Sequence, residues 1–209
     1  AFILYNSKVN QKISMTGQPM SKRETIITTA MTLFNQKSYT SIGVDKIIAE
    51  SKVAKMTFYK YFSSKEVLIE ECLRRRILEV QTSLLDKVNS VDDPLNKLKS
   101  IFNWYIDWIN TEDFSGCLFK KATIEVLQLY PSIKKQVNKY REWIYSLVLS
   151  IFLELEIEDP KVLSSLFLNI IDGLIIDGTI NKPEINSEET WSYINKLIEL
   201  ETKQKYEAA

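Results

Sequence analysis

The sequence predicts an all-α protein with about nine helices. Apolar residues recur at spacings of three and four along most of the chain, which is the period of a helix packed by one face. Breaks in this pattern coincide with Pro or Gly, as at Asp93-Pro94 and Asp159-Pro160. Only 5 Gly and 5 Pro occur in 209 residues, which is few for a β fold rich in turns. We find no stretch with the alternation of a strand.

The helix boundaries follow from capping residues and helix breakers. Ser21 and Glu24 form a capping box at the start of the first helix, and Ser63 and Glu66 form a second one. Proline is tolerated in the first turn of a helix, so several later helices are expected to begin at one. We expect helices over residues 21–37, 44–51, 55–61, 65–89, 94–109, 117–129, 131–155, 160–179 and 188–203.

Residues 43–66 read GVDKIIAESKVAKMTFYKYFSSKE and organise the N-terminal part of the chain. Two short helical patterns are separated by a tight break near Lys52, and the second has apolar positions at Phe58 and Phe62. Lysine, threonine and tyrosine occupy its other positions. A short helix with one aromatic face and one polar, cationic face is typical of a helix-turn-helix. The polar face suits the DNA major groove, where lysine meets phosphate or guanine and hydroxyls reach phosphate or base edges.

This stretch resembles the N-terminal DNA-binding domain of the TetR family of transcriptional repressors. The matching residues are Ile47, Glu50, Val53, Lys55, Thr57, Phe58, Tyr59, Tyr61, Phe62, Ser64, Lys65 and Glu66. The run TFYKYFSSKE is far more specific than a general helix-turn-helix pattern. A second, less specific resemblance covers GCLFKKATIE at residues 116–125. The resemblance implies a three-helix helix-turn-helix domain followed by a larger helical domain for ligand binding and dimerisation.

Three residues depart from the usual pattern of the family. Lys52 stands where the turn usually has Gly, so we expect Lys52 to adopt a positive φ at a modest strain. Ala54 stands where a serine usually caps the recognition helix, which removes a cap worth about 1 kcal/mol. Met56 replaces a frequent Gly or other small residue. We expect these departures to affect local stability and DNA sequence preference rather than the fold.

The resemblance divides the chain into three parts. Residues 1–20 are expected to be a flexible arm or a cloning-derived segment, residues 21–64 the DNA-binding domain, and residues 65–209 the effector-binding and dimerisation domain. Residues 1–66 hold 10 Lys/Arg and 4 Asp/Glu, a net charge of +6 on a chain of zero net charge, which suits a DNA-binding head. Lys65 lies in the first turn of a helix, whose free N–H groups also attract phosphate. The expected DNA-binding residues are Lys55, Thr57, Tyr59, Lys60, Tyr61 and Lys65.

The residue inventory gives no support to an enzyme. The chain has no histidine, the commonest general base and metal ligand, and no nucleophile motif, phosphate loop or metal-ligand cluster. We therefore expect no catalytic residues, no metal site and no cofactor. Cys72 and Cys117 lie far apart in apolar helical surroundings and are expected to be reduced and packed, in a cytoplasmic protein. No stretch of transmembrane length lacks a charge, so we expect no membrane partner.

The helix expected over residues 160–179 is apolar almost all round. Such a helix is buried on two sides, one against its own domain and the other against a partner. Together with the last helix it predicts a four-helix bundle between two subunits, which is how the TetR family dimerises. The expected interface residues are Leu166, Ile170, Leu174, Trp191, Ile194 and Ile198. The alternative is a buried helix in a monomeric bundle.

The helices between residues 94 and 179 are unusually aromatic. The resemblance implies a small-molecule effector bound among them, and aromatic walls suit a hydrophobic or aromatic ligand. The expected wall positions are Phe102, Tyr105, Trp108, Phe119, Trp143, Phe167 and Ile171. The alternative for each is an ordinary core position, the commoner role of aromatic residues at helical spacing. Glu125 and Asp172 either meet a cationic ligand or, as we favour, pair with a neighbour.

These features predict a homodimeric, sequence-specific DNA-binding regulator. We expect it to be a repressor that a small hydrophobic or aromatic effector releases from a palindromic operator. Release requires the ligand to bind the DNA-incompetent arrangement more tightly. One alternative is a helical protein-interaction module with a degenerate DNA-binding head, which the unusual turn at Lys52 keeps open. Another is a helical hairpin in an unrelated all-α protein, where Lys55 and Lys60 are ordinary surface charges.

Overall fold

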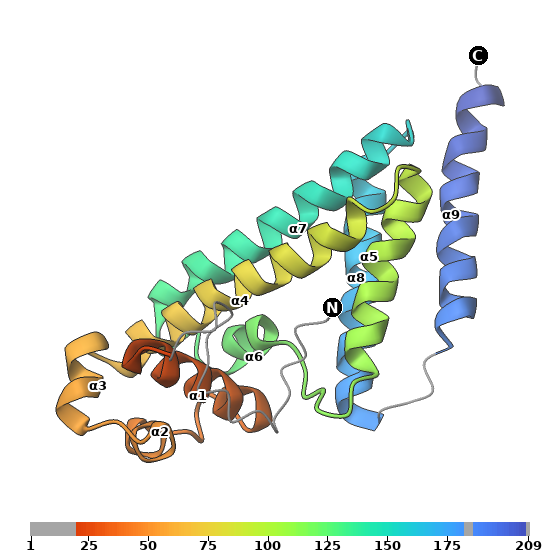
Figure 1. Ribbon diagram of the computed structural model, residues 1–209. Helices are drawn as coiled ribbons and strands as arrows, with labels where there is room; N and C mark the ends of the chain where they lie inside the picture. The colour runs from red at the N-terminus through yellow and green to blue at the C-terminus, as the bar shows by residue number, and fades with distance from the viewer. Residues whose placement is uncertain (1–19, 182–185, 208–209) are drawn as a thin grey trace. The chain divides into compact units, whose positions relative to one another are not determined.

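The computed structural model describes residues 20–181 and 186–207, and all regular structure in these ranges is helical (Figure 1). The elements are α1 (Lys22–Gln36), α2 (Val44–Ser51), α3 (Lys55–Tyr61), α4 (Lys65–Val88), α5 (Pro94–Ile109), α6 (Leu118–Glu125), the 3-10 turn η1 (Pro131–Ile133), α7 (Lys134–Glu154), α8 (Pro160–Asn181) and α9 (Ser187–Glu207). The predicted all-α fold is confirmed for the described part of the chain. The arm expected over residues 1–20 lies, except for its last residue, outside the described residues.

Capping serines begin α1 and α4. The Oγ of Ser21 accepts a hydrogen bond from the Glu24 N–H at 3.2 Å, as predicted. At α4 the Oγ of Ser64 accepts from the Val67 N–H at 3.2 Å. The cap of α4 is therefore Ser64, and the capping box predicted from Ser63 is wrong by one residue.

Helix α6 is shorter than the expected helix over residues 117–129, because the chain leaves helical geometry at Val126. The N–H of Tyr130 donates to the Val126 carbonyl at 2.8 Å, which closes a turn. Tyr130 itself has φ −129° and ψ 77°. Proline disfavours helical backbone in the residue before it, so Pro131 prevents a helix from running on through Tyr130.

The chain forms two compact units. The first unit consists of Ala1–Glu79 and Cys117–Lys139, and the second consists of Val80–Gly116 and Tyr140–Ala209. Helices α4 and α7 each contribute residues to both units. Helix α6, which lies far along the chain from α1 to α3, belongs to the same unit as they do. The division into domains at residue 65 stays a prediction.

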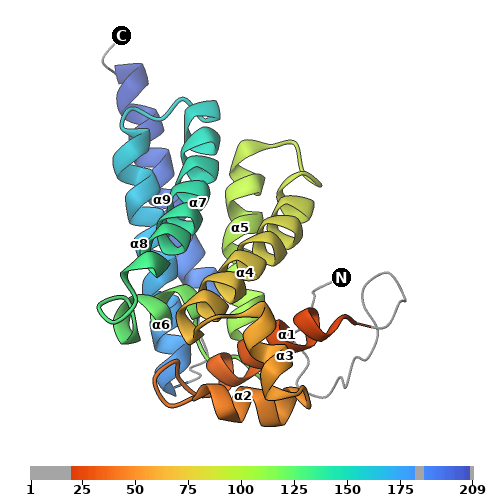
Figure 2. The same ribbon diagram turned by 90° about the vertical axis from the view of Figure 1, so that its left-hand side faces the viewer.

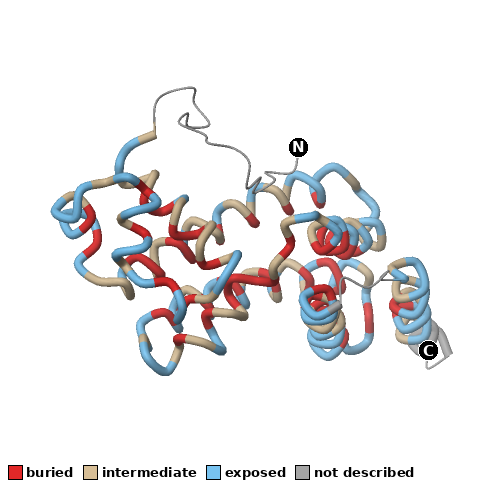
Figure 3. The backbone as a smooth tube through the Cα atoms, turned by 90° about the horizontal axis from the view of Figure 1, so that it is seen from below, coloured by how far each residue is buried: buried red, intermediate tan, exposed pale blue. Residues whose placement is uncertain are grey.

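In the first unit, α1, α2 and α3 pack against one another around an apolar centre (Figure 2). The side chains buried there are Ile26, Ala30, Phe34, Ile47, Phe58 and Phe62. Buried and exposed stretches alternate along the backbone, as one-sided helices require (Figure 3). Helices α2 and α3 are too short to be stable in isolation, so this packing holds them in shape.

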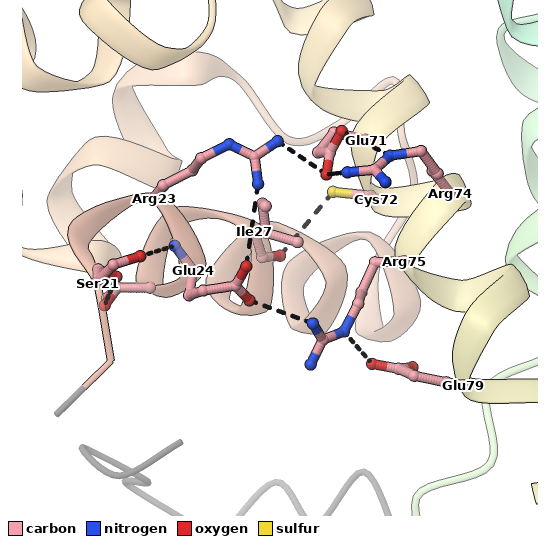
Figure 4. A network of polar contacts seen from close by, with 10 residues as sticks. Ser21, Arg23, Glu24, Ile27, Glu71, Cys72, Arg74, Arg75 and Glu79 are labelled. Atoms are coloured by element: carbon pink, nitrogen blue, oxygen red, sulfur yellow. Dashed lines mark hydrogen bonds and ion pairs between the residues drawn. The ribbon is translucent and has the colours of Figure 1, made fainter. Parts of the chain in front are cut away.

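Charged side chains also join α1 to the first part of α4 (Figure 4). Arg23 pairs with Glu71 at 2.8 Å, and Arg75 pairs with Glu24 at 3.5 Å. The guanidinium of Arg23 also lies over the Phe62 ring, 5.6 Å from its centroid. Each partly exposed pair contributes less than about 1 kcal/mol. Together these contacts hold α1 and α4 next to Phe62, which caps the C-terminal end of α3.

In the second unit, α5 and α8 approach closely at Gly178. A Cβ added to Gly178 would lie 2.4 Å from Cγ2 of Ile109 and 3.2 Å from Cε1 of Phe114. Both of those side chains are buried. Helix α9 packs on α5 as well, with the rings of Trp191 and Phe102 centred 5.6 Å apart.

Helix α8 has two apolar faces. One face is buried in the second unit and carries Leu163, Phe167, Ile171 and Ile175; the other is exposed and carries Val162, Leu166, Ile176 and Ile180. The predicted all-round apolar character is confirmed. Among the described helices, only this one is long and apolar enough to cross a membrane. Its Asp172 forms an ion pair with Arg141 at 2.6 Å, which favours protein packing over lipid contact for this helix.

We predict that Gly178→Ala destabilises the protein by about 1–3 kcal/mol, because the added methyl group overlaps Ile109 in a filled region. Chemical denaturation at a fixed protein concentration measures the effect. The control is Gly173→Ala in the same helix, where the added Cβ meets nothing within 4 Å in the protomer. Equal unfolding midpoints for Gly178→Ala and the parent would contradict the close approach.

Candidate nucleic-acid interface

The turn between α2 and α3 depends on Lys52. This residue has φ 55° and ψ 31°, in the left-handed region, and its N–H donates to the Ala49 carbonyl at 3.3 Å. A non-glycine residue in this region carries a strain of about 1 kcal/mol. Ala54 precedes α3 with extended backbone and supplies no side-chain cap. Both expectations are confirmed, and the turn keeps helix-turn-helix geometry without the usual glycine and serine.

Two aromatic side chains anchor one face of α3 and thereby direct its other face outward. Phe58 is 0% exposed, and Phe62, which ends the helix, is 1% exposed. Successive helical residues are turned by about 100°, so the side chains opposite these two point away from the core. The exposed side chains of α3 are Lys55, Met56, Tyr59, Lys60 and Tyr61, while Thr57 is half-buried. The predicted DNA-binding residues of this helix thus lie on one short element, and their contact with DNA stays a prediction.

Acidic side chains on α2 pair with lysines of this region. Asp45 Oδ1 lies 3.3 Å from Lys55 Nζ, and Glu50 Oε1 lies 2.7 Å from Lys46 Nζ, which lowers the pKa of Glu50. Exposed pairs of this kind contribute little stability, so a phosphate can replace Asp45 as the partner of Lys55. The sequence reasoning missed Asp45, because no helical spacing relates residues on two different helices.

Lys65 is turned toward the protein. Its Nζ donates to the Tyr39 carbonyl at 2.5 Å, and the side chain is half-buried. Burial lowers the pKa of Lys65, while nearby Glu125 acts in the opposite direction. An ammonium group has three donors, and this bond uses one of them. The phosphate contact expected for Lys65 therefore stays a prediction that requires another donor.

Tyr39 links α6 to the loop after α1. Its N–H donates to Glu125 Oε2 at 2.6 Å, and its hydroxyl donates to the Leu118 carbonyl at 3.2 Å. Complete burial raises the pKa of the Tyr39 phenol well above its ordinary value. Lys121, on the same helix, donates to the Asn35 carbonyl at 2.6 Å. We call Tyr39, Leu118, Lys121 and Glu125 the α6 clamp. Sequence reasoning did not find this set, although the favoured pairing of Glu125 with a neighbour is confirmed.

The helices that carry this interface match a known family. The family model described as "Bacterial regulatory proteins, tetR family" matches residues 26–72, from α1 into α4. Over residues 26–72, the N-terminal helices of this chain therefore belong to the tetR family of bacterial regulatory proteins.

Related sequences include two HTH-type repressors and an uncharacterized HTH-type regulator. The chain is 29% identical over 119 residues to the HTH-type transcriptional regulator YuxN of Bacillus subtilis, covering 56% of this chain and 41% of YuxN. It is 27% identical over 121 residues to the repressor NemR of Escherichia coli, covering 56% and 60%. It is 22% identical over 123 residues to the repressor DhaR of a Mycobacterium species, covering 58% and 61%. The chain thus spans about half the length of the curated relatives that it matches.

Solved TetR-family structures share the fold over most of the chain. SCO4454 from Streptomyces coelicolor superposes with a TM-score of 0.78 at 22% identity, covering 87% of this chain and 96% of that one. Reduced NemR of E. coli gives a TM-score of 0.69 at 19% identity, covering 84% and 96%. At these identities the likeness shows the fold alone, over both the N-terminal helices and the helices that follow them.

The predicted effector-wall residues fall in both units. Phe119 belongs to the first unit, and the second unit contains Phe102, Tyr105, Trp108, Trp143, Phe167 and Ile171. The buried hydroxyls of Tyr105 and Tyr140 are hydrogen-bonded at 2.7 Å. Asp172 pairs with Arg141, so the favoured interpretation of this acid is confirmed. Effector contact by the wall residues stays a prediction.

The predicted dimer residues differ in how much surface they can offer. Leu166 is 45% exposed on the uncovered face of α8, and Ile170 and Leu174 are half-buried. Ile194 and Ile198 are only 3% and 4% exposed, because α9 packs them inside its own unit. These two isoleucines therefore have almost no surface left for a partner. The exposed apolar residues of α9 are Tyr193, Leu197 and Leu200.

We predict that Glu125→Ala lowers the free energy of unfolding by about 1–3 kcal/mol, because the Tyr39 N–H loses its acceptor. Glu125→Gln keeps an oxygen acceptor and should cost less. Urea denaturation measures both, with Glu142→Ala on the exposed side of α7 as the control. A Gln variant as unstable as the Ala variant would contradict the role of this hydrogen bond.

Proposed function

We propose that this TetR-family chain is a cytoplasmic, sequence-specific DNA-binding transcriptional regulator, and specifically a repressor that acts as a homodimer. The observation that carries the proposal is the outward face of α3. That face holds lysine and tyrosine side chains on a helix fixed by Phe58 and Phe62. A short, rigid, cationic helix after a tight turn is the element that a helix-turn-helix protein places in the major groove.

The charges around α3 support DNA as the partner. Lys52, Lys55 and Lys60 are exposed within nine consecutive residues, and Asp45 forms an exposed ion pair with Lys55 at 3.3 Å. Lysines in such a cluster bind phosphate and release counterions, which makes binding strongly dependent on salt. The relatives DhaR and NemR are named as transcriptional repressors, which supports the same interpretation.

The exposed apolar face of α8 supports a homodimer. Its exposed residues recur along the helix at Val162, Leu166, Ile176 and Ile180, which forms a stripe rather than scattered single positions. A second copy of the same stripe gives an isologous two-fold interface. A two-fold dimer presents two α3 helices, so its operator is palindromic with half-sites about 34–36 Å or a multiple of that apart.

The aromatic core of the second unit supports a small apolar or aromatic effector as the releasing signal. Its rings include the cluster of Trp104, Tyr105 and Trp108, which meet in edge-on and tilted arrangements with centroids 4.9–6.4 Å apart. Apolar and aromatic side chains with a few hydroxyls are the usual lining of a small-molecule site. Release requires a coupling of about 1–3 kcal/mol between effector and operator, which changes DNA affinity by about 5–150-fold.

Selection of duplexes from a random DNA pool at two salt concentrations tests the DNA-binding function. We expect an inverted repeat to be enriched, with affinity that falls steeply as salt rises. Lys60→Ala should then weaken operator binding and reduce the logarithmic salt slope by about 1 for each half-site, because a phosphate contact is lost. Lys135→Ala, an exposed lysine of α7, is the control. Absence of any enriched sequence would remove the DNA-binding role and favour a protein-interaction module.

We predict that Leu166→Glu converts the dimer into monomers at micromolar concentration, because it places a charge in the apolar stripe of α8. Analytical ultracentrifugation measures the change, and operator affinity should fall with it. Leu153→Glu is the matched control, since Leu153 is a leucine of the same unit with 58% exposure but lies on α7. If both variants dissociate the dimer, or if neither does, the dimer interface is not the apolar stripe of α8.

A further inference from the structure

Met56 lies on the exposed face of α3, near the N-terminal end of the helix. Successive residues of the helix are turned by about 100°, so Met56 and Lys60 point almost directly away from Phe58 and Phe62. Met56 is 86% exposed, more than any other large apolar side chain among the described residues. It is the second residue of the helix, with Tyr59 and Lys60 one turn further on the same face.

Packing within the protein does not explain a methionine at this position. A side chain with this exposure adds nothing to the core, and a small residue suffices for the turn and the helix. Single exposed apolar residues are common on proteins, so exposure alone has no functional meaning. The location is informative, because this long apolar side chain stands among lysines and tyrosines on the face proposed to meet DNA.

We propose that Met56 is a specificity-determining residue that reads the C5-methyl group of a thymine in the major groove. This inference rests on the proposed DNA-binding function and deepens it. Residues at the N-terminal end of a recognition helix contact base edges, and Met56 is the second residue of α3. Its thioether is only a weak hydrogen-bond acceptor and has no donor, so it cannot read the polar edge of a base as arginine or asparagine does.

The thymine methyl is the only apolar group that an unmodified base pair presents in the major groove. The unbranched methionine side chain has three rotatable bonds and a polarizable sulfur, so it can adapt to that methyl without a fixed hydrogen-bond geometry. Lys60, one turn away, is placed to bind the neighbouring phosphate. In this arrangement Lys60 supplies affinity for any sequence, whereas Met56 supplies a preference for thymine.

The test uses the operator obtained by selection and the full-length protein. Each thymine of a half-site is replaced in turn by deoxyuridine, which removes the methyl group and keeps every hydrogen-bonding group. We expect one position at which this replacement weakens wild-type binding by about fourfold per half-site, the effect of one buried methyl group. Fluorescence anisotropy titration measures the dissociation constants.

Met56→Ala should bind the thymine and deoxyuridine operators equally, because the side chain that senses the methyl is gone. Lys60→Ala is the control and should weaken binding to both operators by the same factor, keeping the wild-type ratio between them. Thermal melting of each variant confirms that the exposed substitutions leave the fold intact.

Two results would overturn the inference while leaving the proposed function in place: wild-type binding that ignores every thymine methyl, or a Met56→Ala variant that still discriminates against deoxyuridine. If no operator can be selected at all, the DNA-binding function fails and the role of Met56 fails with it.

Discussion

The burial of Phe58 and Phe62 is the constraint on which the interface depends. Helix α3 has seven residues, too few to be stable alone, so its rotation about its own axis is set by these two anchors. A shift of one residue would turn the helix by about 100° and carry lysines toward the core. The same anchors are supported from outside by the Arg23 guanidinium over the Phe62 ring. The direction in which the exposed face of α3 points is therefore a consequence of the packing of its buried face.

Local features of the sequence were sufficient to predict most of the secondary structure of α1 to α3. The limits of α2 and α3 agree with the apolar period and the break at Lys52. The positive φ of Lys52 was expected from the resemblance, which places this residue where the TetR family usually has Gly. The α6 clamp could not be predicted in the same way. Tyr39 and Glu125 are 86 residues apart, and hydrogen bonds to backbone groups leave no periodic trace in the sequence. The resemblance at residues 116–125 placed Glu125 in the family's body without indicating its partner.

The second unit shows a different limit of sequence reasoning. The many apolar residues of α8 correctly predicted a helix with two apolar faces, one of which is buried in the protomer. Burial of the other face against a partner stays a prediction. The apolar residues of α9 also recur at helical spacing. That spacing shows that one face of the helix is buried, but it does not show whether the same chain or a partner chain covers that face. Ile194 and Ile198 turned out to be covered within the protomer. The residues that remain available for a partner are identified only when the packing of α5 against α9 is known.

The α6 clamp ties α1 and the loop after it to a segment that follows much later in the chain. A fragment that ends before α6 would leave the Tyr39 N–H without Glu125 and the Asn35 carbonyl without Lys121, at the point where the chain turns from α1 into α2. The head is therefore not a modular unit in the sense of a contiguous sequence. Any chimera that transplants its DNA specificity onto another body needs to carry Cys117–Lys139 together with the first helices.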